Sequence, residues 1–158
     1  MRSTTEMEII IDKYADTVKR ICFLYVKKYH DVEDIFQEVF IKLMNYDKEF
    51  ENDEHLKSWI IRVSINKCKD HLKSFFIKKT CSLENLDYDI PKLEKEDSYV
   101  LEAVLALPEK YKAPIYLHYF EGYTANEIGG ILHKNENTIY TLLSRGRAKL
   151  KEVLGDEE

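Results

Sequence analysis

The chain lacks several features that would indicate a membrane, secreted or metal-binding protein. It has no apolar run of about 18 residues, so no transmembrane helix is expected. Its first residues are polar and acidic, whereas a secretory signal starts with basic residues and an apolar core. Cys22, Cys68 and Cys81 are too widely spaced for a disulfide framework or a zinc site. We therefore expect a cytoplasmic protein that is not inserted in a membrane and holds no metal.

The sequence also lacks a recognisable catalytic set. Its five histidines are scattered, and none has a serine or carboxylate at a spacing typical of catalysis. We therefore expect a protein that is not an enzyme and uses no cofactor.

Glycine and proline are absent before Pro91, so few residues interrupt helices in this part of the chain. Apolar residues at helical spacing predict helices over about residues 8–28 and 56–76. Between these two helices, Asp31 and Asp34 indicate the start of another helix, because acidic residues favour the positive, N-terminal end of a helix. Residues 45–54 are polar and predict a loop.

Residues 80–97 are rich in Ser, Asn and Asp, include a proline and show no sustained period, which is typical of a linker. Beyond it, further helices are expected over residues 99–107 and 108–120, followed by a helix-turn-helix. The predicted fold is therefore all-α, with two small helical domains at residues 1–78 and 98–158. A flexible linker over residues 79–97 would join them.

Charge is distributed unevenly along the chain. The formal net charge is −5, yet residues 57–79 carry seven basic residues and one acid, and residues 134–151 carry five and one. The segment between Thr80 and Asp97 has six acids and two lysines. Because nucleic acids bind to local basic patches, the two basic segments are candidate nucleic-acid surfaces despite the acidic total.

The stretch from Tyr123 to Leu150 has the pattern of a helix-turn-helix. Thr124 and Glu127 form a capping box at the start of its first helix, and Asn135 is a favourable N-cap for its second. The apolar side of the second helix is predicted to contain Ile139, Leu142, Leu143, Leu150, Val153 and Leu154. Its opposite side carries Asn137, Tyr140, Thr141, Ser144 and Ala148, which suits entry into a major groove. The flanking cations Arg145, Arg147, Lys149 and Lys151 suit phosphates.

Two earlier helices carry unusual polar faces. In the helix over residues 56–76, a basic ridge formed by Arg62, Asn66, Lys69 and Lys73 lies between two apolar stripes. One stripe holds Leu56, Trp59, Ile60 and Val63, and the other holds Ile61, Ile65, Cys68, Leu72 and Phe75. The ridge could contact a polyanion or simply solvate a core helix. The acids near Asp31 could dock a basic protein groove or belong to an ordinary amphipathic helix.

The segment Asp31–Phe40 resembles the core-polymerase-binding helix of bacterial RNA polymerase sigma factors of the small extracytoplasmic-function (ECF) type. Seven of its ten residues match the family pattern D-A-E-D-L-V-Q-E-V-F. The resemblance implies that this helix binds the β′ clamp of core RNA polymerase. The residues it assigns to that contact are Asp31, Glu33, Asp34, Ile35, Gln37, Glu38 and Phe40.

The segment from Phe50 to Asn66 resembles the part of these factors that melts the −10 promoter element and captures an exposed base. The implied −10 contacts are Asn52, Asp53, Glu54, His55, Lys57, Ser58, Trp59, Arg62, Asn66, Lys69 and Lys73. The C-terminal stretch resembles the domain that reads the −35 element. Its implied contacts are Thr124, Asn135, Glu136, Asn137, Thr138, Tyr140, Thr141, Ser144, Arg145, Arg147 and Lys149. The helices over residues 99–120 would pack against the β flap.

The chain departs from the family pattern at several positions. His133 replaces the usual turn glycine, and Lys134 replaces an apolar residue of the same turn. Tyr140 and Leu142 replace customary basic residues, and Glu51 replaces a basic residue of the −10 loop. These changes concern promoter sequence and affinity.

The resemblance implies a sigma factor that binds core RNA polymerase and directs initiation at promoters with defined −35 and −10 elements. It also implies an anti-sigma protein that sequesters the factor. Two alternatives stay open on the residues alone: a freestanding helix-turn-helix regulator, and a module that binds polymerase or another partner without reading promoters. The basic ridge and the acidic helix favour the sigma factor, because a freestanding regulator needs neither.

Overall fold

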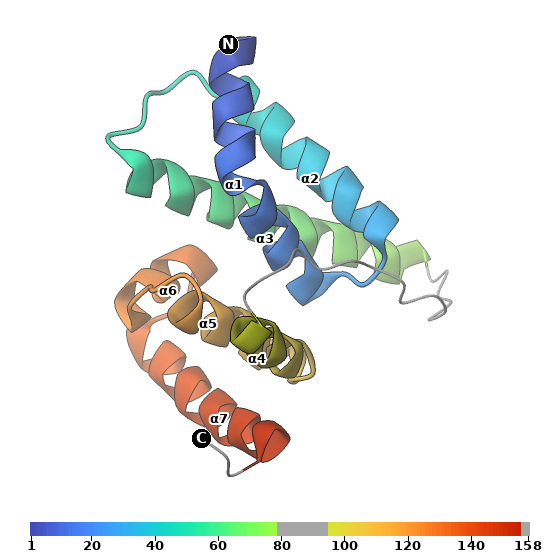
Figure 1. Ribbon diagram of the computed structural model, residues 1–158, viewed down its shortest axis with the longest axis vertical. Coiled ribbons are helices and arrows are strands. Elements are labelled where there is room, and N and C mark those ends of the chain that lie inside the picture. Colours follow the sequence, from blue (N-terminus) through green and yellow to red (C-terminus); the bar gives the residue numbers. More distant parts are fainter. Residues whose placement is uncertain (79–94, 156–158) are drawn as a thin grey trace. The chain divides into compact units, whose positions relative to one another are not determined.

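The computed structural model describes residues 1–78 and 95–155, which contain seven α-helices and no β-strand (Figure 1). The chain divides into two compact units, Met1–Pro91 and Lys92–Glu158. The expected all-α, two-domain fold is confirmed. Of the predicted linker, residues 79–94 lie outside the described residues, whereas residues 95–97 belong to a helix that starts at Lys95, so the prediction is wrong there. Within the described parts, no helix combines the length and apolar character needed to cross a membrane.

The first unit contains three helices: α1 (Thr4–Tyr25), α2 (Tyr29–Met44) and α3 (Asp53–Lys78). Both α1 and α3 begin about three or four residues earlier than the apolar pattern predicts, because a polar side chain caps each start. Ser3 accepts a hydrogen bond from the backbone N–H of Glu6 at 3.1 Å. Asn52 likewise accepts one from the backbone N–H of His55 at 2.9 Å.

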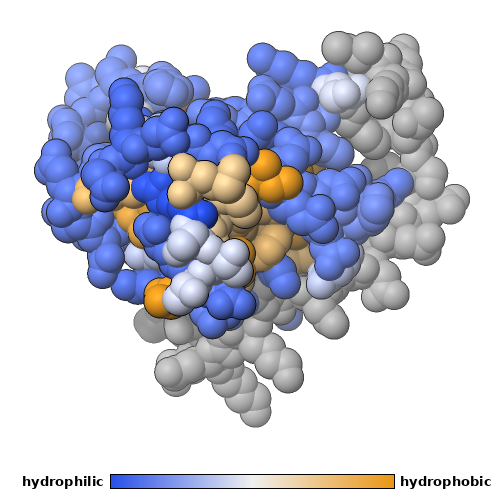
Figure 2. All heavy atoms as spheres, turned by 90° about the horizontal axis from the view of Figure 1, so that it is seen from above, coloured by the Kyte–Doolittle hydropathy of each residue, from blue (hydrophilic) through white to orange (hydrophobic). Residues whose placement is uncertain are grey.

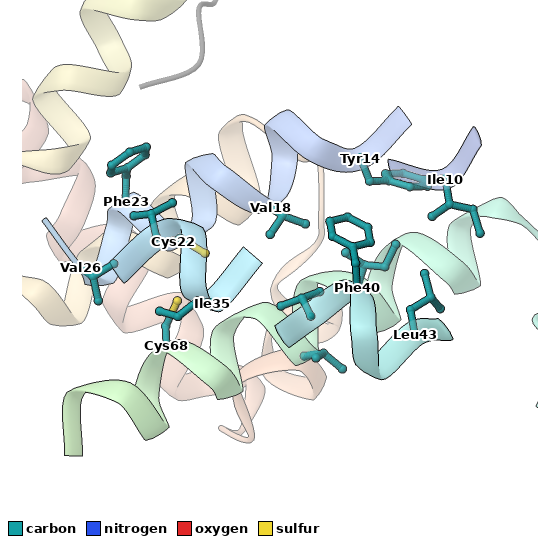
Figure 3. Packing of buried hydrophobic residues seen from close by; sticks show 14 of the residues in the cluster. Ile10, Tyr14, Val18, Cys22, Phe23, Val26, Ile35, Phe40, Leu43 and Cys68 are labelled. Atoms are coloured by element: carbon teal, nitrogen blue, oxygen red, sulfur yellow. The ribbon is translucent and has the colours of Figure 1, made fainter. Parts of the chain in front are cut away.

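Each helix of the first unit packs against the other two, around one hydrophobic core. Figure 3 shows Val18 of α1, Ile35 and Phe40 of α2 and Cys68 of α3 pointing into this core. Ile60, Cys68 and Leu72 belong to this cluster, and Ile61 and Ile65 are buried as well, so residues of both apolar stripes on α3 are buried. Burial on both stripes leaves a narrow exposed strip along α3 that contains Arg62, Asn66 and Lys73.

The second unit contains α4 (Lys95–Leu105), α5 (Glu109–Tyr119), α6 (Ala125–Leu132) and α7 (Glu136–Leu154). Pro108 precedes α5 as its N-cap residue, where its missing N–H costs no helical hydrogen bond. The longest helix of this unit, α7, packs closely on α5 at Gly146. A Cβ atom there would lie 2.8 Å from Cγ1 of Ile115, so glycine allows the two helices to approach.

The helix-turn-helix consists of α6, a tight turn and α7. The predicted capping box is present: the Thr124 hydroxyl accepts from the backbone N–H of Glu127 at 3.2 Å, and the Glu127 carboxylate accepts from that of Thr124 at 2.9 Å. Asn135 caps α7 by accepting from the backbone N–H of Thr138 at 2.8 Å. His133 ends α6 in the left-handed conformation, with φ of 60°. Its replacement of glycine therefore places a Cβ where the backbone disfavours one.

Candidate polymerase and promoter surfaces

The exposed side of α2 is an acidic face formed by Glu33, Asp34, Gln37 and Glu38. Ile41 continues this face one turn further and is 55% exposed, which is unusual for a large apolar side chain. The face therefore combines negative charge with one accessible apolar group. A basic and partly apolar groove on a partner would complement it.

Two residues assigned to the polymerase contact by resemblance point the other way. Ile35 and Phe40 are 1% and 5% exposed and lie in the core of the first unit, as Figure 3 shows. Their side chains hold α2 against α1 and α3 rather than forming part of the exposed face. The helical period of α2 carries this information, because Val32, Val39 and Leu43 share the buried side.

Two ion pairs join α2 to α3. Asp31 lies 3.4 Å from Nε2 of His71, and Glu38 lies 3.5 Å from Nζ of Lys67. Asp31 and His71 are both partly buried, with side chains 24% and 29% exposed. Pairs near the surface contribute about 0–1 kcal/mol to the free energy of folding. The main effect of these two pairs is therefore to orient the acidic side chains of α2.

The connection between α2 and α3 ends in an aromatic cluster of Tyr46, Phe50, His55 and Trp59. The Tyr46 ring centroid lies 5.4 Å from that of Phe50 and 4.8 Å from that of Trp59. Phe50 is 5.7 Å from Trp59 and 5.1 Å from His55, with edge-to-face geometry in both pairs. Each such contact stabilises the arrangement of the two rings by about 0.5–1.5 kcal/mol. Trp59 is therefore held by its neighbours rather than standing alone as a stacking platform.

The four residues expected to form the −10 loop are all exposed, but only Asn52 precedes α3, and Asp53, Glu54 and His55 form the first turn of that helix. Asn52 caps α3, and the backbone N–H of Glu51 donates to Nδ1 of His55 at 3.1 Å. Asp53 accepts a hydrogen bond from Nζ of Lys13 at 3.0 Å, which raises the pKa of the Lys13 ammonium. Glu54 is exposed beside them. Backbone and ionic contacts thus hold the cap and first turn of α3, while the four residues stay exposed to solvent.

The basic ridge lies on the exposed strip of α3. Arg62, Asn66 and Lys73 are exposed and Lys69 is partly buried, so the structure brings the four together on one side as expected. Lys57 and Ser58, one turn nearer the loop, are partly buried, and the Ser58 hydroxyl donates to the His55 carbonyl at 3.1 Å. The loop and the ridge therefore form a continuous polar surface along α3.

On α7 every residue assigned to the −35 contact is exposed. The row Asn137, Tyr140, Thr141, Ser144 and Ala148 runs along one side, with Arg145, Arg147 and Lys149 beside it. Glu136 and Thr138 lie exposed in the first turn, and Thr124 and Asn135 are exposed caps. On the buried side, Ile139 and Leu143 are in the core as predicted. Val153, expected there too, is 51% exposed, and the close packing is made by Gly146 instead.

The surface fits a protein that binds through polar contacts. On the face shown in Figure 2, hydrophilic residues surround a smaller central group of hydrophobic ones. In the described part of the chain, no three His, Cys, Asp or Glu side chains gather as metal ligands would. Sequence reasoning missed Ile41 on the acidic face, Tyr46 in the aromatic cluster and Arg2, whose contacts are long-range.

Comparisons with known proteins agree with this arrangement. Residues 10–74 match the family model of Sigma-70 region 2, and residues 97–150 match that of Sigma-70, region 4. The chain is 32% identical over 143 residues to RNA polymerase sigma factor SigV of Bacillus subtilis, covering 88% of this chain and 85% of SigV. It is 27% identical over 165 residues to ECF RNA polymerase sigma factor SigW of the same organism, covering 93% and 88%.

Solved structures share the fold. Sigma factor RpoE from Bartonella quintana, crystallised with the anti-sigma factor NepR, superposes with a TM-score of 0.73 at 17% identity, covering 98% of this chain and 100% of that one. CnrH, solved with the cytosolic domain of CnrY, gives a TM-score of 0.66 at 17% identity, covering 99% and 92%. The chain therefore belongs to the sigma-70 family as an ECF-type RNA polymerase sigma factor, which directs promoter-specific initiation, and is neither a freestanding regulator nor a module without promoter recognition.

Proposed function

We propose that the acidic face of α2 docks on the β′ clamp of core RNA polymerase. The proposal is supported by the exposure of Glu33, Asp34, Gln37 and Glu38 on a helix whose other side is fixed in a core. A helix that is already ordered presents its charges without a further ordering cost on binding. Asp31 joins this surface from its pair with His71, while Ile35 and Phe40 act by holding the helix in place.

The −10 element is read by the same unit. The segment Asn52–His55 at the start of α3 receives an unpaired base, and Trp59, Lys57, Ser58 and the basic ridge bind the strand on either side. Sequence-specific capture of single strands uses unstacked bases held in a pocket, with cations along the backbone. The observation that carries the proposal is that one three-helix unit has acids on α2 and a basic strip on α3, so that one unit binds both polymerase and DNA.

The −35 duplex is read by α7, with α6 and the cap residues Thr124 and Asn135 at the backbone. Asn137, Tyr140, Thr141 and Ser144 face the base edges in the major groove, and the arginines and Lys149 contact phosphates. Glu136 and Thr138 lie at the helix start, where recognition helices meet the bases. The helices α4 and α5 pack against the β flap.

An anti-sigma protein sequesters the factor until a signal releases it. RpoE, which shares the fold, was crystallised with such a protein, NepR. The factor performs no chemistry itself and acts in the cytoplasm, on polymerase and DNA. Its net charge of −5 fits a protein that binds promoter DNA weakly until polymerase adds its own contacts.

Run-off transcription tests the proposal. Purified core polymerase is supplied with a pool of genomic promoter fragments, with and without the protein. Transcripts that depend on the protein and share −35 and −10 sequences are expected, and the shared sequences give its specificity. Binding to core polymerase without any specific transcript from the pool would contradict the promoter-reading assignments.

A further inference from the structure

Arg2 reaches from the N-terminal segment to the connection between α2 and α3, more than forty residues away in the sequence. Its guanidinium donates to the carbonyl oxygens of Leu43 at 3.4 Å, Lys48 at 2.9 Å and Tyr46. Its backbone N–H donates to the carbonyl of Met44 at 3.1 Å. Only 10% of the Arg2 side chain is exposed, with its bonds to Leu43 and Tyr46 partly buried and its bond to Lys48 at the surface.

These bonds suit the end of a helix. The last carbonyls of α2 have no partners within the helix, and they form the negative end of its dipole. The Arg2 guanidinium bonds one of them, Leu43, together with the carbonyls of Tyr46 and Lys48 just beyond the helix, because its donors are held in a planar fork. An ammonium on a flexible stem would supply the charge without that geometry. Glu6, with Oε2 3.6 Å from Nε of Arg2, helps to orient the fork from the first turn of α1.

The same guanidinium also touches the aromatic cluster. Its Cζ lies 5.1 Å from the centroid of the Phe50 ring, close enough for a cation–π contact. Phe50 in turn packs on His55 and Trp59, both of which are assigned to the −10 surface. One side chain thus contacts the end of α2, the backbone of Tyr46 and Lys48, and the Phe50 ring, which packs on residues assigned to the −10 surface.

We propose that Arg2 is a positioning residue for −10 recognition: it fixes residues 45–52 and the aromatic cluster so that Asn52–His55 are held in place to receive an unpaired base. Arg2 itself does not touch DNA in this proposal, which rests on the assignment of the −10 surface above. Preforming a loop strengthens binding by removing the cost of ordering it. At the other end of the loop, the Lys13–Asp53 pair fixes the start of α3.

The test compares holoenzymes assembled from core polymerase and the full chain carrying Arg2→Lys or Arg2→Ala. Open-complex formation is followed by permanganate reactivity of −10 thymines, and −10 selectivity by competition between promoters that differ in one −10 base. Both variants should lose roughly tenfold in open-complex formation and part of the −10 selectivity, because hydrogen bonds to a charged group are lost. In the chain without polymerase, the fluorescence of Trp59, its single tryptophan, should also shift, because the aromatic cluster around it loosens.

Core affinity and −35 dependence should stay unchanged in both variants. Lys27→Ala removes an exposed cation just beyond the C-terminal end of α1. It serves as the matched control and should behave as wild type. Wild-type selectivity in Arg2→Ala would overturn the proposal, and so would a parallel loss of core affinity, which would indicate a purely structural role. A wild-type holoenzyme indifferent to the −10 base would instead refute the −10 assignment, and the role of Arg2 with it.

Discussion

A Cβ atom on Gly129 would lie 2.5 Å from the carbonyl oxygen of Lys134, so these two residues close the turn of the helix-turn-helix by direct backbone approach. The Gly129 carbonyl also accepts hydrogen bonds from the backbone N–H groups of His133 and Lys134, the latter at 3.0 Å. A side chain at Gly129 would push the two helices apart. The orientation of α7 relative to α6 therefore depends on the absence of one methyl group.

Gly129→Ala should destabilise the second unit by about 1–3 kcal/mol, the usual cost of forcing an extra carbon into a packed site. Gly130→Ala is the matched control, because nothing lies within 4 Å of its Cβ position and it is exposed on the same helix. It should stabilise α6 by about 0.5–1 kcal/mol through helix propensity. Urea unfolding followed by circular dichroism measures both. Equal stability of the two variants would contradict the tight turn.

His133→Gly should stabilise the protein by about 1 kcal/mol, because glycine adopts the left-handed conformation without the Cβ penalty. Among the described residues, His133 is the only one other than glycine with positive φ. Lys134→Gly, one residue along the same turn, should give no such gain. Thermal unfolding of the two variants provides the comparison, and a gain of the same size at both positions would argue against strain at His133.

Gly146→Ala should destabilise the packing of α7 on α5 by about 1–3 kcal/mol through overpacking. The added carbon would lie 2.8 Å from Cγ1 and 3.0 Å from Cδ1 of Ile115, whose side chain is fully buried. Trimming that neighbour with Ile115→Val should recover part of the loss. A double-mutant cycle in urea measures the coupling. Additive effects of the two substitutions would show that the residues do not press on each other.

The helices and most of their starts could be predicted from the sequence because the determinants are local. The first ninety residues have no glycine or proline, and the apolar residues recur at helical spacing. The errors at the starts of α1 and α3 come from underrating Ser3 and Asn52, whose capping role also lies in the local sequence. The surface residues of α7 were placed correctly, since an amphipathic helix with a marked capping site fixes its own faces.

The supports of the candidate site could not be predicted in the same way. The contacts of Arg2 with Tyr46 and Phe50 span more than forty residues, and nothing near Arg2 in the sequence indicates them. Resemblance assigned Ile35 to the polymerase contact, because a family motif records only which residue types recur. The fold determines the direction of each side chain, and Ile35 is buried in the core. Such directions follow from packing between helices, and so from the tertiary structure.

Titration of Lys13 should reveal its bond to Asp53. The hydrogen bond raises the pKa of the ammonium above its ordinary value of 10.5, so the stabilisation from this pair is present below that pH and lost as pH rises through the higher, folded-state pKa. Asp53→Asn should return the pKa towards its ordinary value. Detection of the Lys13 side chain by NMR across this alkaline range measures it. Identical titration in the variant would mean that the pair does not form in solution.

Charge reversal should separate polymerase binding from promoter melting, because the two surfaces lie on different helices. Glu33→Lys with Asp34→Lys on the acidic face should weaken core affinity by about tenfold or more through like-charge contacts with a basic groove. Arg62→Glu with Lys73→Glu on the basic ridge should leave core affinity intact and reduce −10 melting. All four side chains are exposed, so thermal stability should change little. Glu8→Lys with Asp12→Lys, two exposed reversals on α1, gives the same change in net charge as the α2 variant and is its control. If both double variants lost the same function, the division of labour between α2 and α3 would be wrong.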